Sequence, residues 1–284
     1  MKPPLFSYVA PETVAECLEL LRQFGSDAKI MAGGQSLMPL LALRMARPGV
    51  VIDIGRIKEL NFVRKDGDVV RIGAGLRQRV IERDPIFTQD LPLLRQAADF
   101  IGHVATRSRG TIVGSLCHAD PAAELPVCAA LLGAQFVIAS ARGERKVAAK
   151  QFFESALVTI LKEDELVTEV RFPVQAPGSG FAFTEIARRH GDFAMVSVGA
   201  MMRRNGGQVD SAIALGGVGA TPLVFGVEDF AHGDGAASYK RTAAGIMEAL
   251  EPAEDLHATA AYRRSLAGVL VERVLSAASG RMQR

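Results

Sequence analysis

RGTIVGSLCHADPAAELP, residues 109–126, is the stretch of sequence that decides the expected fold. Within it, and in Ser108 just before it, a polar loop with two glycines and three hydroxyl side chains passes abruptly into an apolar segment typical of a helix, and two acids follow. Glycine lets the backbone approach a ligand closely, and the amides at a helix N-terminus carry a partial positive charge. We therefore expect residues 110–115 to bind an anionic group, with the hydroxyls of Thr111 and Ser115 as further donors.

An earlier loop, AGGQS at residues 32–36, has the same character. Hydrophobic spacing predicts a strand, a glycine turn, a helix and a second strand, in the order 28–32, 33–34, 37–47 and 50–54. The amides of Gly34, Gln35 and Ser36 can then converge on an anion. The alternative is a tight turn in which Ser36 only caps the helix. Together, the two loops predict a diphosphate group held from two sides.

The two acids follow the second loop too closely to bind phosphate themselves. Asp120 or Glu124 is instead expected to accept a hydrogen bond from a ribose hydroxyl, although Asp120 stands before a proline and is equally suited to cap the next helix. GQSLM at 34–38 begins like a nucleophile elbow, but Met38 stands where the second glycine belongs, so a serine hydrolase is not expected. LGGVGATP at 215–222 lacks the spacing of a dinucleotide fingerprint and is interpreted as a strand end and turn.

Elsewhere, hydrophobic spacing and turn residues divide the chain into two parts. The first part has predicted helices at 11–24, 77–86, 91–101 and 121–132, a hairpin at 62–64 and 69–73, and strands at 134–140, 146–148 and 165–173, the last of them half-buried. APGSG at 176–180 has the composition of a linker. The second part has predicted strands at 180–186, 194–202 and 208–217 and helices at 239–250 and 259–275. Strands followed by helices predict an α+β domain with the helices on one sheet face.

Composition bounds the class of protein. The 284 residues exceed the roughly 100 to 200 usual for one domain, and the formal charge of +2 is too small to imply a nucleic-acid or membrane partner. The cysteines (Cys17, Cys117 and Cys128) and the five histidines are widely scattered, so neither a disulfide framework nor a metal site is expected. The N-terminus lacks the apolar region of a signal peptide, and the longest apolar run, 125–141, is shorter than the ~20 residues that span a bilayer. A cytoplasmic protein without a membrane span is expected.

The two loops closely resemble the FAD-binding loops of the medium subunit of molybdenum hydroxylases. The segments that match are AGGQSL at 32–37, GTIVGS at 110–115 and HADPAAELP at 118–126, and the likeness continues through ELVTEV at 165–170, GDFA at 191–194, LGGV at 215–218 and residues 255–264, which begin with DLHA and end with YRR. The family includes carbon monoxide dehydrogenase, xanthine dehydrogenase and bacterial N-heterocycle dehydrogenases. The resemblance implies an FAD-binding domain of vanillyl-alcohol-oxidase type at 1–176, with subdomains at about 1–56 and 57–176, and a smaller α+β C-terminal domain at 177–284.

The resemblance also implies a set of cofactor-binding residues. The FAD diphosphate would contact the two loops, Glu124 would take the acidic position near the ribose, Leu166 would lie against the flavin, and Phe193 matches a position that is aromatic in some relatives. The implied set is Ala32, Gly33, Gly34, Gln35, Ser36, Leu37, Thr111, Ile112, Val113, Gly114, Ser115, His118, Ala119, Asp120, Glu124, Leu166 and Phe193. There are two departures from the family pattern. Val113 stands where relatives usually have glycine, and Glu185 stands where some relatives carry lysine.

The implied function is that of an electron-transfer flavoprotein subunit without catalytic residues of its own. FAD would accept electrons from the two [2Fe-2S] clusters of a small partner subunit and pass them to an external acceptor. A large molybdopterin-binding subunit would oxidise the substrate, in a dimer of heterotrimers. One alternative is a structural subunit that has lost FAD, which is suggested by Val113 in place of the family's glycine. Another alternative is a stand-alone flavin oxidase. The lack of an obvious general base near the loops argues against it.

Overall fold

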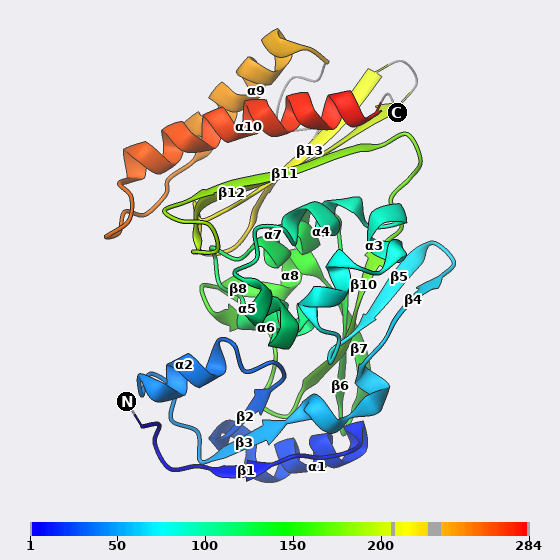
Figure 1. The fold of residues 1–284 in the computed structure, drawn as a ribbon, viewed down its shortest axis with the longest axis vertical. Coiled ribbons are helices and arrows are strands. Elements are labelled where there is room, and N and C mark those ends of the chain that lie inside the picture. The colour runs from blue at the N-terminus through cyan, green and yellow to red at the C-terminus, as the bar shows by residue number, and fades with distance from the viewer. Residues whose placement is uncertain (1, 206–207, 227–233, 283–284) are drawn as a thin grey trace.

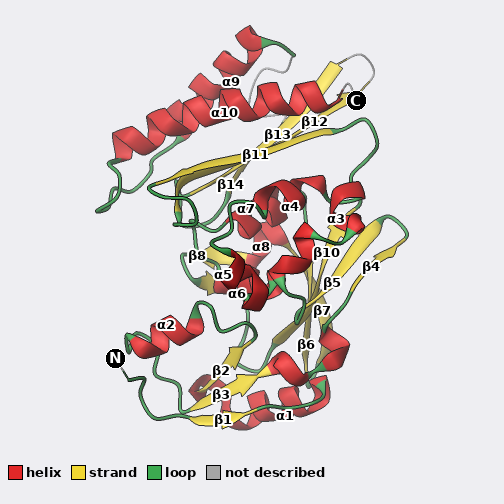
Figure 2. Ribbon diagram, in the orientation of Figure 1, coloured by secondary structure: helices red, strands yellow, loops and turns green. Residues whose placement is uncertain are grey.

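The structure of the chain, a computed structural model, describes residues 2–205, 208–226 and 234–282. Three units of sheet and helix lie one above another along the long axis of the molecule (Figure 1, Figure 2). The chain runs from the lowest unit in Figure 1, through the middle one, to the uppermost one, where the C-terminus lies. One hydrophobic core joins the lower two units and extends to Phe181, Phe183 and Ala214 of the uppermost unit, and a second core lies within the uppermost unit.

The N-terminal unit carries the first glycine loop. Its parallel strands lie in the order β1 (Ser7–Val9), β3 (Val50–Asp53) and β2 (Ala28–Met31), and its helices are α1 (Val14–Phe24) and α2 (Leu37–Ala42). The predictions for α1, β2 and β3 are confirmed. The prediction that α2 extends to residue 47 is wrong, because Arg44 adopts a left-handed φ of 58° and the amide of Met45 donates back to the carbonyl of Leu40 at 2.9 Å.

The middle unit is an antiparallel sheet with helices packed around it. The strand order is β4 (Val63–Asp66), β5 (Val69–Gly73), β10 (Leu166–Pro173), β6 (Gln135–Ser140) and β7 (Gly143–Ala148). The other elements are α3 (Pro85–Gln89), α4 (Pro92–Ala97), α5 (Val104–Arg109), α6 (Ile112–His118), α7 (Glu124–Leu131), α8 (Ala149–Phe152), β8 (Phe153–Ser155) and β9 (Val158–Thr159). The predicted hairpin and strands are confirmed. However, β10 is central and mostly buried instead of half-buried, and its Glu169 is paired with Arg71 at 2.8 Å.

The helices predicted in the middle unit are shorter than expected. Residues 78–82 form a 3-10 turn, and α3 and α4 each begin at a proline, which lacks the amide needed to continue a preceding helix. The helix predicted from residue 121 begins only at Glu124. The carboxylate of Asp120 accepts the amide of Ala122 at 2.9 Å, so Asp120 closes a turn and does not cap α7.

The C-terminal unit is an antiparallel meander covered by two helices. Its strands lie in the order β11 (Gly180–Ala187), β12 (Ala194–Asn205), β13 (Gln208–Gly216) and β14 (Leu223–Phe225), and its helices are α9 (Ala236–Ala249) and α10 (Ala260–Met282). Both helices lie on one face of the sheet, as predicted, while α4 and α7 contact the other face (Figure 1). Arg281 of α10 links the C-terminal unit to the middle unit. Its guanidinium donates to Gln96 Oε1 at 2.8 Å and to the carbonyl of Phe181 at 2.7 Å.

Candidate cofactor-binding site

The two glycine loops, 77 residues apart in the sequence by the numbers of Gly33 and Gly110, are in direct backbone contact. A Cβ atom built on Gly33 would lie 2.4 Å from the carbonyl oxygen of Arg109 and 2.7 Å from Cα of Gly110. A Cβ on Gly114 would lie 3.6 Å from Cβ of Ala32. Only glycine fits at position 33, because any side chain there would collide with the other loop. The structure therefore brings the two predicted loops together.

The first loop presents backbone amides beyond the end of β2. Gly34 has a φ of +71°, which turns the chain from the strand toward α2, and its carbonyl accepts the amide of Met38 at 3.0 Å. Ser36 occupies the N-cap position of α2, yet its side chain makes no capping hydrogen bond. Within the described part of the chain, the amides of Gly34, Gln35 and Ser36 donate to no acceptor. Such amides at a helix start are suited to an anionic ligand.

The second loop has fewer free donors than the anion-binding segment predicted at 110–115. The Oγ1 atom of Thr111 caps α6 by accepting the amide of Gly114 at 3.0 Å. The amide of Ile112 donates to the carbonyl of Leu76 at 3.1 Å, and the carbonyl of Gly110 accepts the amide of Gln78 at 2.9 Å. The amides of Ile112 and Gly114 are thus already used inside the protein, the first because this loop pairs with the chain leading to the 3-10 turn and the second because Thr111 caps α6.

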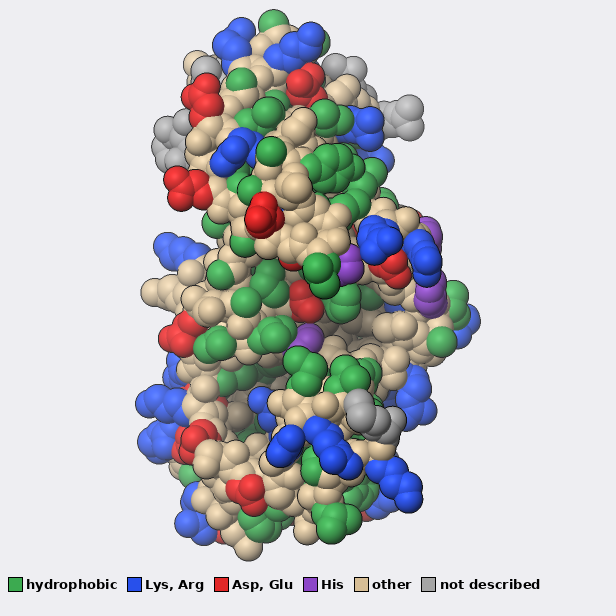
Figure 3. All heavy atoms as spheres, turned by 90° about the vertical axis from the view of Figure 1, so that its left-hand side faces the viewer, with side chains coloured by type: hydrophobic (Ala, Val, Ile, Leu, Met, Phe, Trp, Pro, Cys, Tyr) green, Lys and Arg blue, Asp and Glu red, His purple; other side chains and the backbone are tan. Residues whose placement is uncertain are grey.

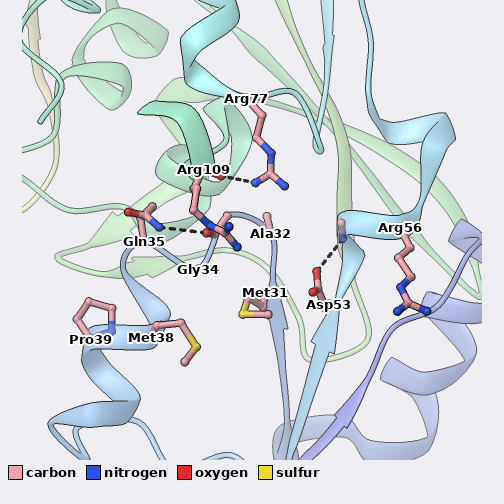
Figure 4. A pocket seen from close by; sticks show the side chains of 12 residues that line it. Met31, Ala32, Gly34, Gln35, Met38, Pro39, Asp53, Arg56, Arg77 and Arg109 are labelled. Atoms are coloured by element: carbon pink, nitrogen blue, oxygen red, sulfur yellow. Dashed lines mark hydrogen bonds between the residues drawn. The ribbon is translucent and has the colours of Figure 1, made fainter. Parts of the chain in front are cut away.

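A cavity of about 580 Å³ lies where the loops meet (Figure 4). It is lined by Met31, Ala32, Gly33, Gly34, Gln35, Met38, Pro39, Asp53, Gly55, Arg56, Arg77 and Arg109. Figure 4 shows Arg77 and Arg109 approaching the first loop from the side of the second, while Asp53 and Arg56 lie at the end of β3. Because β2 and β3 are parallel and Met31 pairs with Asp53, the C-terminal ends of both strands lie at this cavity.

The three cavity arginines were missed by sequence reasoning. Burial and the neighbouring Arg109 guanidinium lower the pKa of Arg77, while Asp53 acts in the opposite direction. Arg77 also donates to the carbonyl of Arg109, which holds its guanidinium beside the loop. An arginine stays charged at neutral pH even when its pKa falls, so the cavity combines amides with positive charge. Arg56 could have been recognised as a site residue because it follows the C-terminal end of β3. No local sequence pattern marks Arg77 as a site residue.

Four of the predicted residues follow the second loop at the corner between α6 and α7. His118 ends α6, and its pKa is lowered by burial and by Lys29 against the opposing effect of Asp120. Ala119 takes the left-handed conformation that turns the chain, with a φ of 52°. Glu124 is the first residue of α7 and is 8% exposed, and burial raises its pKa to about 7.

The remaining predicted residues do not line the cavity. Ser36, Leu37, Thr111, Gly114 and Ser115 are not among its lining residues, and Ile112 and Val113 are packed in the hydrophobic core. Leu166 begins β10 and is also buried in that core. Phe193 is 67% exposed in the turn between β11 and β12, whose Gly191 packs against His103 at the start of α5. LGGV at 215–218 is the strand end and turn that the sequence predicts, with Gly217 at a φ of +76°.

The residues that line the cavity fit a phosphate-bearing cofactor. Glycines leave no room for side chains where the loops touch, unpaired amides lie at the start of α2, and guanidinium groups supply charge. Figure 3 shows the face that bears α2, where basic side chains gather on the lower part of the molecule. Across the described ranges, no cluster of three or more metal-binding side chains occurs. None of the helices in these ranges is long and apolar enough to cross a membrane.

The chain matches two family models that together cover most of its length. The model described as "FAD binding domain in molybdopterin dehydrogenase" matches residues 4–175. The model described as "CO dehydrogenase flavoprotein C-terminal domain" matches residues 181–278. The predicted cofactor is thereby confirmed at the level of the domain, since the first match is an FAD-binding domain.

Relatives and solved structures agree with these matches over the whole chain. The caffeine dehydrogenase subunit beta of a Pseudomonas species is 40% identical, with 99% of this chain and 97% of that protein covered. The carbon monoxide dehydrogenase medium chain of Hydrogenophaga pseudoflava is 39% identical, with 99% of each covered. The solved carbon monoxide dehydrogenase of the same organism superposes with a TM-score of 0.94 over 99% of both chains, at 39% identity. Quinoline 2-oxidoreductase from Pseudomonas putida gives 0.93 at 36% identity, over 99% of this chain and 100% of that one. The chain belongs to the family of FAD-binding medium subunits of molybdenum hydroxylases.

Proposed function

We propose that this chain binds FAD across the two glycine loops and passes electrons from iron–sulfur clusters on a small partner subunit to an external acceptor. The observation that most directly supports this proposal is the backbone contact between Gly33 and the loop that begins at Arg109. This contact lies beside a cavity with unpaired amides and three arginines. Substrate oxidation would take place at a molybdopterin cofactor in a large partner subunit. The names of the relatives support this division, since they describe medium and beta subunits of dehydrogenases.

Named residues of this chain would hold the cofactor. The amides of Gly34, Gln35 and Ser36 would donate to the diphosphate, and Arg77 and Arg109 would neutralise its charge. When bound, FAD supplies the redox chemistry, and the protein positions it and sets its surroundings. Phe193 and Leu166 would lie beside the flavin ring, the first as an exposed cover and the second as part of the core beneath it.

The proposal includes the organisation of the chain and of the complex. The FAD-binding domain spans 1–176, with subdomains of about 1–56 and 57–176, and 177–284 form the C-terminal domain. The complex is a dimer of heterotrimers located in the cytoplasm. A complex isolated from its host through a tag on this chain should contain iron and molybdenum as well as flavin. A tagged chain that co-purifies with flavin but with neither metal would refute the electron-transfer role and leave FAD binding intact.

Val113→Gly is expected to destabilise the chain without increasing its flavin content. Val113 is 2% exposed inside α6, so the variant loses a buried side chain and gains a helical glycine, at a cost of about 3 kcal/mol. Urea unfolding and the ratio of flavin to protein measure the two effects. Val269→Gly, at a half-exposed position of α10, is the control and should lose only about 1 kcal/mol. A large gain of flavin in Val113→Gly would favour the structural subunit that has lost FAD.

A further inference from the structure

A buried ion pair joins the 3-10 turn at residues 78–82 to α5, close to the cavity but outside its lining. The guanidinium of Arg107 in α5 pairs with the carboxylate of Glu82, the last residue of the turn. The side chain of Arg107 is 10% exposed and that of Glu82 is 20% exposed. Arg107 also donates to the carbonyl of Ile101 at 2.8 Å and to that of Gly102 at 3.2 Å. One guanidinium therefore connects the turn, α5 and the segment before α5.

Further polar contacts extend from this ion pair toward the second glycine loop. Arg79 donates to Oγ of Ser108 at 3.0 Å, and this hydroxyl donates to the carbonyl of Val104 at 2.7 Å. The amide of Gln78 donates to the carbonyl of Gly110 at 2.9 Å. The 3-10 turn and α5 are thus held side by side from the ion pair at one end to the glycine loop at the other.

Two of the three cavity arginines stand at the loop end of these elements. Arg77 comes directly before the 3-10 turn, and Arg109 is the last residue of α5. Figure 4 shows the guanidinium of Arg77 directed at the carbonyl of Arg109, to which it donates. The same carbonyl oxygen leaves no room for a side chain on Gly33. The placement of the turn on α5 therefore sets both the spacing of the two guanidinium groups and the contact between the glycine loops.

A buried ion pair is better suited to fixing such a placement than to stabilising the fold. Taking two charges out of water costs free energy, which their mutual attraction often fails to offset. The guanidinium of Arg107 is planar, however, and it meets one carboxylate and two carbonyls only in one relative placement of the three groups. Without the pair, the turn would be freer to shift on α5.

We propose that Glu82 and Arg107 are a positioning pair for the FAD diphosphate, acting through Arg77 and Arg109 without contacting the cofactor. The inference rests on the proposed function and deepens it by naming what holds the charged part of the site in place. Loss of the pair should weaken FAD binding. It should also make the affinity less sensitive to salt, because misplaced guanidinium groups attract the diphosphate less. A role in folding alone would lower stability without changing the salt dependence.

FAD titrations of the full chain at two salt concentrations, followed by flavin fluorescence, test the pair. Glu82→Gln keeps the shape of the side chain without its charge, and Arg107→Lys keeps a charge that cannot form the same fork of hydrogen bonds. Each should bind FAD about tenfold more weakly than the native chain at low salt, with a smaller salt dependence. Glu169→Gln is the matched control, because Glu169 is also buried and paired, with Arg71 at 2.8 Å. It should lose stability but keep native affinity and salt dependence.

The outcomes separate the positioning pair from the broader proposal. Native affinity, or weaker binding with native salt dependence, in folded Glu82→Gln and Arg107→Lys would overturn the pair and leave the proposed function standing. An equal loss of affinity in Glu169→Gln would do the same, since any buried ion pair would then have this effect. If Arg107→Lys fails to fold, Glu82→Gln decides alone. A folded native chain that binds no FAD would overturn both proposals.

Discussion

Gly33→Ala should lose FAD almost completely while the rest of the chain stays folded. The added Cβ would lie 2.4 Å from the backbone carbonyl oxygen of Arg109, and backbone cannot move aside as a flexible side chain can. Forcing the two loops apart costs about 3 kcal/mol, which corresponds to FAD binding weaker by about 100-fold. Equilibrium titration of the apoprotein with FAD, followed by fluorescence, gives the affinity directly.

Gly280→Ala is the matched control for this substitution. Gly280 lies in α10, and a Cβ built there meets no atom within 4 Å. The control should bind FAD with native affinity, since it only adds a methyl group to an exposed helix position. Circular dichroism of Gly33→Ala should show a native spectrum. If Gly33→Ala binds FAD as tightly as Gly280→Ala, the contact between the loops does not form the cofactor site.

The double variant Arg77→Met/Arg109→Met should weaken FAD binding by about 1000-fold. Both guanidinium groups line the cavity, and each hydrogen bond from a charged group to the diphosphate is worth about 2 kcal/mol. The loss should be larger at low salt, because the native interaction is electrostatic and salt screens it. Isothermal titration calorimetry at two salt concentrations measures both the loss and its salt dependence.

Arg22→Met/Arg142→Met provides the corresponding control. Both arginines are about 60% exposed and each pairs with a surface acid, Glu19 and Asp164 respectively. Exposed pairs contribute little, so FAD affinity should stay native and stability should change by less than about 1 kcal/mol. Equal FAD affinities for the two double variants would show that the cavity arginines do not contact the diphosphate.

The strand, glycine loop, helix and strand around residues 28–53 were predictable because each signal is local. A strand pattern that runs into two glycines and then into apolar helical spacing leaves few alternatives. The length of α2 was not predictable in the same way, because its end depends on Arg44 adopting a left-handed conformation that favours glycine. The short β1 was missed because its pairing with β3 is a contact between distant segments.

The charge of the site could not be predicted from the sequence. Arg77 and Arg109 are 32 residues apart in the sequence, and the pairing of residues 76–78 with residues 110–112 brings them together. Glu185 has an ordinary strand neighbourhood in the sequence, yet the structure buries it on a sheet whose strands β12 and β13 pack against α7. Burial of this kind depends on how the sheets pack on one another, which no short motif encodes.

Flavin content is the measurement that tests the central claim most directly. The full chain is purified, alone or within its complex, then denatured, and the released flavin is identified and quantified against protein. The account predicts FAD at about one molecule per chain, because one pair of loops forms one diphosphate site. A folded chain within its assembled complex that carries no flavin, and takes up none when FAD is added, would contradict it.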